Sequence, residues 1–231
     1  MCRLALIDKK GIKYIVENYG LENLFNYLEQ QLGGHGNGYC IIHNDGSYCI
    51  NKGVTLSNNT IVDEILKEID DIRWVIYHTR LASIGVVSNR NCHPFEHKGR
   101  VMVMNGTERN YPIINTKLTD TENILLGSEN ILNDTKDYHS VFLGYENGRV
   151  FANKNSGSLK YIACGNGGKI FASSFPIEYY KKDKVYEAPQ SFVEGDTIKG
   201  LRQATLSCYG YYNRNRNMVY DDYYYMGLRW L

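Results

Sequence analysis

The chain has 231 residues with 26 basic and 25 acidic side chains, a formal net charge of +1 at pH 7. This even balance gives no global attraction to nucleic acid or to an anionic membrane surface, so a small ligand or a protein partner is the better expectation. The length permits one large domain with a substantial buried core. Six cysteines lie without CxxC spacing, and no signal peptide or long apolar span is visible, so we expect a cytoplasmic protein with reduced thiols and no metal site.

The N-terminus combines a cysteine with a strand. Met1 precedes Cys2, and the apolar residues 3–7 follow. If the initiator methionine is removed, one residue carries a thiol with a pKa of ~8.5 and an α-amine with a pKa of ~8. A terminal amine can activate the nucleophile of its own residue, so Cys2 is a candidate nucleophile. The alternative is an inert, buried small residue.

The next elements are a helix and a hairpin. Residues 21–32 place leucines and a phenylalanine on one stripe at helical spacing, and Gly33-Gly34 ends the helix. A glycine-rich loop over 33–38 leads to two short strands joined at residues 44–46, whose Asp-Gly step suits a hairpin turn. The loop lacks the Gly-Lys-Ser/Thr of a phosphate loop. Its glycines indicate either close backbone approach to a substrate or to the N-terminal cysteine, or a plain turn.

Two buried strands then end in polar residues. After a second helix over 60–69, the strand 72–77 leads into His78-Thr79-Arg80, and the strand 101–104 stops at Asn105-Gly106. Sites are commonly built where strands end in loops. A third helix is expected over 123–132, with residues 119–122 as its cap.

From residue 140 the pattern becomes a meander of strands, with an Asn-Gly turn, a Gly-rich turn and a last edge over 191–200. This order of elements predicts a layered α+β fold. We expect one domain over residues 1–200 and a Tyr-rich extension over 201–231. The extension is open to three interpretations: packing on the domain or a partner, disorder, or stacking on nucleic acid bases, which the Asp221-Asp222 pair argues against.

Three clusters occur together in this chain: Cys2 at the start, HTRLASIG over 78–85 with NRNCHPF over 89–95, and MNGT followed by TDTE. In this order they resemble the class II glutamine amidotransferases, a family of N-terminal nucleophile hydrolases, over roughly residues 2–200. The resemblance implies a four-layer αββα sandwich with antiparallel sheets. Two departures are visible: Met104 stands where the family commonly has His, and HGNG replaces the usual Asp-Gly-Trp-Gly type of loop.

The resemblance also implies roles for individual residues. Cys2 would attack the glutamine side-chain amide, with its own α-amine as general base, and the oxyanion would be held by the Asn105 side chain and the Gly106 N–H. Arg80 would bind the substrate α-carboxylate and Asp120 its α-ammonium group, while Ser83 and Gly85 lie where the family's loop meets the substrate. Each has a structural alternative: an ion pair for Arg80, a helix cap for Asp120, and an ordinary turn for Asn105-Gly106. His93 is interpreted as a structural histidine with satisfied hydrogen bonds.

The function expected from this resemblance is a stand-alone glutaminase or amidotransferase subunit. It would hydrolyse glutamine to glutamate and ammonia through a Cys2 thioester, without a cofactor, and pass the ammonia to a separate synthetase or amidoligase. Two alternatives stay open: a hydrolase of a γ-glutamyl amide in a small thiol or peptide, and a catalytically silent regulatory or binding subunit.

Overall fold

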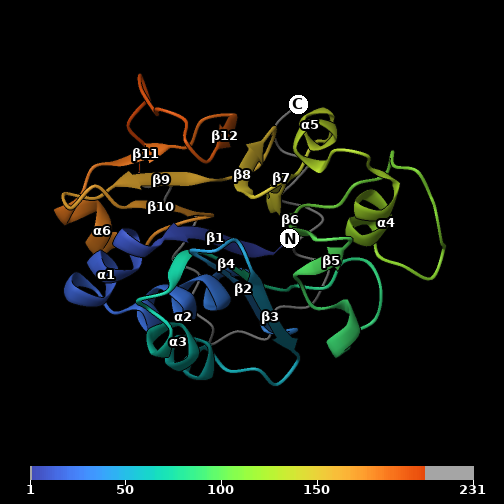
Figure 1. The fold of residues 1–231 in the computed structure, drawn as a ribbon, viewed down its shortest axis with the longest axis horizontal. Coiled ribbons are helices and arrows are strands. Elements are labelled where there is room, and N and C mark those ends of the chain that lie inside the picture. The colour runs from blue at the N-terminus through green and yellow to red at the C-terminus, as the bar shows by residue number, and fades with distance from the viewer. Residues whose placement is uncertain (1, 206–231) are drawn as a thin grey trace, which may run out of the picture.

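The computed structural model describes residues 2–205, which form four layers. Two antiparallel sheets are stacked face to face, and helices cover their outer faces (Figure 1). The expected α+β, four-layer αββα sandwich is confirmed.

The seven-stranded sheet has the order β11-β9-β10-β1-β4-β2-β3. Its strands are β1 (Arg3–Asp8), β2 (Asn37–His43), β3 (Tyr48–Gly53), β4 (Ile72–Thr79), β9 (Lys160–Ala163), β10 (Lys169–Ala172) and β11 (Val185–Glu187). The five-stranded sheet has the order β12-β8-β7-β6-β5. Its strands are β5 (Phe95–His97), β6 (Arg100–Asn105), β7 (Val141–Glu146), β8 (Arg149–Lys154) and β12 (Ser191–Val193).

The helices are α1 (Lys9–Asn18), α2 (Leu21–Leu32), α3 (Asn58–Lys67), α4 (Asp120–Gly127), α5 (Ile131–Asp134) and α6 (Ile177–Lys182). Helices α1, α2 and α3 pack on the seven-stranded sheet, and α4 and α5 pack on the five-stranded sheet. Figure 1 shows these two groups on different sides of the strands.

Strand β1 explains why the N-terminal run is apolar at every position. Leu4 and Leu6 point into the core between the sheets, whereas Ala5 and Ile7 point into the core beneath the helices. Side chains alternate between the two faces of a strand, and both faces of this central strand are covered. The continuous apolar run therefore follows from a position between two hydrophobic layers.

The predicted third helix over 123–132 is wrong in detail. Thr119 forms a capping box with Glu122, so α4 begins at Asp120, and the helix ends at Gly127. A separate short helix, α5, starts after Asn130, whose side chain accepts a hydrogen bond from the Asn133 backbone N–H. Gly and a second N-cap residue within the apolar pattern break the helix.

Four elements were missed from the sequence: α1, β5, α6 and β11. Strands β5 and β11 have three residues each, too few to show alternation. Helix α1 buries only Gly11, Ile12 and Ile15, which gives a sparse apolar stripe.

The described chain packs beyond the predicted boundary at residue 200. The Ala204 N–H donates to the Val185 carbonyl, and the Glu187 N–H donates to the Arg202 carbonyl. The Tyr-rich segment 206–231 lies outside the described residues, so its predicted roles stay predictions. Within residues 2–205, no helix has the length and hydrophobicity needed to cross a membrane.

Candidate active site

Antiparallel pairing brings the N-terminus to the end of β4. Arg3 is opposite Thr79 in the β1–β4 ladder, so Cys2 and Arg80 lie side by side at the same end of these two neighbouring strands. Strand β6 of the other sheet ends at Asn105, and the Cys2 backbone nitrogen donates to Asn105 Oδ1 at 3.0 Å. Strand ends from both sheets therefore meet at Cys2.

A small cavity of about 20 Å³ lies at this meeting point. Its lining comes from the start of β1, the 80–84 loop, the end of β6 and the start of α4. The lining residues are Cys2, Arg80, Leu81, Ser83, Ile84, His93, Met104, Gly106, Thr119, Asp120 and Thr121. Of the residues predicted from the sequence, five line the cavity. Asn105 and Gly85 are outside the lining and contact Cys2 and Arg80 instead.

The thiol of Cys2 is nearly enclosed, with the residue 7% exposed. Burial raises the pKa of the Cys2 thiol, while the nearby positive charge of Arg80 acts in the opposite direction. The Sγ atom lies 3.7 Å from the Leu81 carbonyl oxygen and donates a weak hydrogen bond to it. A thiol in this environment is protonated at neutral pH, so a base is needed to make it a nucleophile.

Asn105 and Gly106 present two potential donors beside Cys2. Asn105 Nδ2 makes only a long contact of 3.5 Å, to Ser173 Oγ, and therefore has capacity to donate elsewhere. Gly106 has φ of 155°, and a Cβ there would lie 2.0 Å from Ser140 Oγ. Only glycine fits at this position.

Two residues that hold this region were not found from the sequence. The buried Glu108 carboxylate accepts from the Ser140 backbone N–H at 2.6 Å and from Ser140 Oγ, and the Glu108 N–H donates to Asp120 Oδ2 at 3.0 Å. Ser173, at the end of β10, accepts from the Leu4 N–H at 3.1 Å. Glu108 directly follows the MNGT motif, which was a usable signal. Ser173 is distant in sequence and gave none.

Arg80 and Asp120 are buried ionisable groups without ion-pair partners in the described chain. The guanidinium of Arg80 donates to the carbonyls of Val86 at 3.1 Å and Ile84 at 2.8 Å, and no carboxylate of residues 2–205 lies within 4.0 Å of it. Asp120 accepts only from backbone N–H groups, and burial raises the pKa of its carboxyl group. A buried charge is costly unless it is paired. The alternative interpretation of Arg80, a structural ion pair, is not formed within the described residues.

Two histidines are stacked beneath the cavity. The rings of His78 and His93 have centroids 4.1 Å apart. His78 Nε2 contacts the Met104 carbonyl, and His93 Nε2 contacts Thr121 Oγ1. Burial lowers the pKa of His78 to about 3 and that of His93 well below its usual range, so both rings are neutral at pH 7. The prediction that His93 is satisfied holds for only one of its nitrogens, because its Nδ1 has no hydrogen-bond partner among the described residues.

The glycine-rich loop approaches another part of the chain, not the N-terminal cysteine. A Cβ at Gly36 would lie 2.4 Å from Cys92 Sγ, and one at Gly38 would lie 2.0 Å from the His93 carbonyl oxygen. The Arg80 N–H donates to the Gly36 carbonyl at 2.8 Å. The glycines thus let the 92–93 segment pack closely against β2 and fix the backbone of Arg80.

Two loops contact each other beside the cavity. Ser83 Oγ and Thr107 Oγ1 are 2.9 Å apart, and Gly85 takes φ of 75° as the first loop turns back. A volume of about 20 Å³ holds about one water molecule. A ligand of amino-acid size therefore does not fit unless the lining residues move apart.

No protein-family model matches the sequence, and no curated protein matches it. Among solved structures, the chain is similar to the glutamine phosphoribosylpyrophosphate amidotransferase from B. subtilis complexed with ADP and GMP. That likeness has a TM-score of 0.55 and 13% identity, over 90% of this chain and 50% of that chain. The allosteric regulatory enzyme of purine biosynthesis is similar with a TM-score of 0.54 and 14% identity, over 84% of this chain and 48% of that chain.

A glutamine aminotransferase class-II domain protein from Silicibacter pomeroyi has a TM-score of 0.42 at 11% identity, over 84% of this chain and 98% of that chain, and a score this low carries no argument. The first two likenesses show that the chain has the fold of these two proteins, a four-layer sandwich of the N-terminal nucleophile hydrolase type. The chain spans about half the length of these two proteins.

Proposed function

We propose that this chain, which has the fold of class II glutamine amidotransferase domains, hydrolyses the side-chain amide of glutamine to glutamate and ammonia through a Cys2 thioester. The observation that carries the proposal is the convergence of Cys2, Arg80, Gly106 and Asp120 on one small cavity. A nucleophile, an oxyanion donor and two opposite charges are what amide hydrolysis of an amino acid requires.

The unpaired charges support glutamine as the substrate. Arg80 is a buried cation and Asp120 a buried carboxyl group, and neither has an ion-pair partner within the described residues. The α-carboxylate and α-ammonium groups of a free amino acid would supply both missing partners. A planar guanidinium binds a carboxylate through two parallel hydrogen bonds, so Arg80 would exchange its loop carbonyls for the substrate.

The proposed reaction begins after Met1 is removed, because the Cys2 nitrogen is otherwise an amide without basicity. The free amine takes the thiol proton, and Sγ attacks the amide carbon of glutamine. Asn105 Nδ2 and the Gly106 N–H donate to the resulting oxyanion. The proton then passes from the amine to the departing ammonia, which leaves a thioester. A water molecule, deprotonated by the same amine, attacks the thioester and releases glutamate.

We propose that the ammonia passes to a synthetase or amidoligase whose acceptor site lies outside residues 2–205, because these residues form the four layers of the sandwich. A second candidate substrate is a γ-glutamyl amide with a larger leaving group. It is favoured by a neighbouring cavity of about 590 Å³ lined by the 107–110 and 134–139 segments, which begins at the residue after Gly106. Parallel turnover of glutamine and γ-glutamyl amides distinguishes the two.

The test is glutamate release from glutamine by the full chain, with intact mass recording the loss of Met1. Cys2→Ser should abolish release, and Cys164→Ser, which changes a buried cysteine outside the cavity, should retain it. A glutamine analogue with an electrophilic ketone should label Cys2 alone. Retained turnover in Cys2→Ser would overturn the proposal, and so would a processed chain that neither turns over nor is labelled, as expected of a silent subunit.

A further inference from the structure

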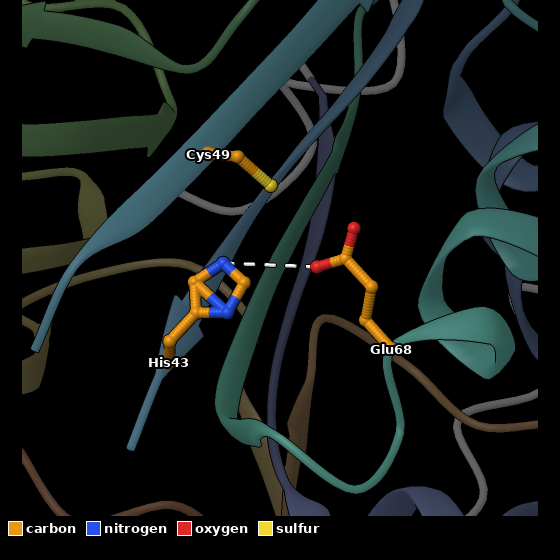
Figure 2. Close-up of side chains that lie close together, drawn as sticks. All are labelled: His43, Cys49 and Glu68. Carbon is orange, nitrogen blue, oxygen red and sulfur yellow. Dashed lines mark ion pairs between the residues drawn. The ribbon is translucent and has the colours of Figure 1, made fainter. Parts of the chain in front are cut away.

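A histidine, a cysteine and a glutamate meet at the far end of the seven-stranded sheet. His43, Cys49 and Glu68 each offer one ligand atom, and these atoms all lie within 4.8 Å of one another. Figure 2 shows His43 and Cys49, from the β2–β3 hairpin, facing the Glu68 carboxylate, which comes from the end of α3. Residues 43, 49 and 68 show no metal-binding spacing in the sequence, which is why the sequence predicted no metal site.

Local backbone structure aims these side chains at one point. The β2–β4 register shifts between Ile42 and His43, and an irregularity of this kind re-aims a side chain. His43 Nε2 lies 3.7 Å from Glu68 Oε2. Bonds of 2.0–2.3 Å in a tetrahedral zinc site place ligand atoms about 3.3–3.8 Å apart. The pair already has this separation, and since all three atoms lie within 4.8 Å the thiol needs to move by at most about 1 Å.

The surroundings of His43 match those of a metal-binding histidine. Asp71 Oδ2 lies 3.4 Å from His43 Nδ1, and Asp71 is fixed in turn by Asn44, whose backbone N–H and side-chain amide donate to it at 3.0 and 3.2 Å. A hydrogen bond from Nδ1–H to such a carboxylate would leave Nε2 free to bind a metal, and Asp71 is close enough to accept one after a small rotation of the ring. His43 Nδ1 is also buried and makes no aligned hydrogen bond within the described chain.

The charges around the cluster are negative. Glu68 and Asp71 lie next to His43, and Glu64, one turn earlier on α3, accepts from the Tyr39 hydroxyl. Cys49 faces both glutamates, and burial, followed by the charge of Glu68, raises the pKa of its thiol. A bound divalent cation would reduce the electrostatic repulsion between these acidic groups.

From this geometry we propose that His43, Cys49 and Glu68 bind one Zn²⁺ ion. Thiolate, imidazole and carboxylate together suit zinc, whereas calcium and magnesium prefer oxygen ligands alone. Three protein ligands leave one coordination position for a water molecule, and the Glu68 side chain is 41% exposed. On binding, the Cys49 S–H bond breaks, its proton leaves to solvent, and an S–Zn bond forms. The ion would fasten the β2–β3 hairpin to the end of α3.

The site is distant from Cys2. In the β2–β4 ladder, Asn37 at the other end of β2 lies opposite Thr79, next to Arg80. His43 is six residue steps along the strand from Asn37, which is about 20 Å. The proposed metal site and the proposed glutaminase site therefore succeed or fail independently.

The test uses the full chain stripped with a chelator and titrated with Zn²⁺ or Co²⁺. We expect one ion per chain and, with Co²⁺, a thiolate-to-metal charge-transfer band. Cys49→Ser should abolish the band, and His43→Gln and Glu68→Gln should each weaken Zn²⁺ binding at least tenfold. The matched controls Cys2→Ser and His97→Gln should bind as the unmodified chain does. Zinc at about a hundred times its Kd should raise the melting temperature by roughly 5–10 °C.

Three results would overturn the proposal: no zinc binding by the unmodified chain, a cobalt band lost in Cys2→Ser but kept in Cys49→Ser, or affinity unchanged in both His43→Gln and Glu68→Gln. Glu68→Gln changes a partly exposed side chain after the helix, so it keeps the test valid if Cys49→Ser does not fold. Glutaminase turnover measured on the same stripped samples should be unchanged.

Discussion

Replacing Asn105 with Asp separates two tasks that the proposed mechanism assigns to one side chain. Oδ1 accepts from the Cys2 nitrogen at 3.0 Å, while Nδ2 makes only a 3.5 Å contact and is free to donate to an oxyanion. Asp has the same shape and keeps the acceptor, but it has no amide donor. Loss of one oxyanion donor costs about 2.7–4 kcal/mol of transition-state stabilisation, so kcat should fall 10²–10³-fold with KM little changed.

The same substitution has a predicted effect on pH dependence. A carboxylate 3.0 Å from the Cys2 amine favours the ammonium form, and an opposite charge this close raises a pKa by about 1–3 units. The amine acts as a base only when it is unprotonated, so the acidic limb of the kcat/KM profile should move to higher pH by about that amount. At the alkaline plateau kcat should still be 10²–10³-fold lower than in the unmodified chain, because the amide donor is absent at every pH.

The assay is glutamate release under steady-state conditions between pH 5 and 10, with the melting temperature of each variant measured alongside. Asn153→Asp is the matched control: Asn153 is fully buried in β8 and donates to the Leu132 carbonyl and to Thr135 Oγ1. It should lower stability without changing kcat per folded molecule. If Asn105→Asp kept kcat within about threefold at its alkaline plateau, the assignment of the oxyanion donor would be refuted.

Three further predictions follow from the site and its surroundings. Asp120→Asn should raise KM for glutamine about 10–100-fold, because it removes the charged partner of the substrate α-ammonium group. Turnover of glutaramate, which lacks the α-amine, should be unchanged. Equal effects on both substrates would contradict the proposal that Asp120 binds the α-ammonium group. Gly106→Ala should lower both the melting temperature and kcat, since its Cβ would lie 2.0 Å from Ser140 Oγ. Adding Ser140→Gly removes the Oγ and Cβ atoms of residue 140, so the nearest atom of that residue is then Cα, 3.2 Å from the new Cβ. The double variant should therefore recover part of the stability. His78 and His93 are held neutral, with pKa values below those of the unfolded chain. Stability from these rings is therefore full above pH ~6.5 and lost as the pH falls, by about 2 kcal/mol at pH 5 for His78, and His78→Gln should show a shallower decline in thermal melts.

The sequence was most informative where the physics is local. The stripe of residues 21–32 predicted α2 with its observed bounds, and the Asp-Gly step predicted the β2–β3 turn, because both depend on neighbours along the chain. The site residues came from a resemblance in motif order, and Cys2 and Arg80 meet because β1 and β4 pair antiparallel. Ser173 and the zinc ligands could not be predicted, because each depends on elements whose relative placement is set by long-range packing.

The buried charges of the cavity connect stability with the proposed function. Arg80 is 3% exposed and satisfied only by neutral carbonyls of its own loop, so its charge stays uncompensated within the described residues. An uncompensated buried charge lowers the free energy of unfolding, and a ligand carboxylate that pairs with Arg80 would offset this loss on binding. Since a cavity of about 20 Å³ is too small for an amino acid, part of the free energy gained by this pairing must offset the rearrangement that enlarges the cavity. Ligands without a carboxylate should therefore fail to enlarge the cavity, so the proposed site would select a free amino-acid end over an arbitrary amide.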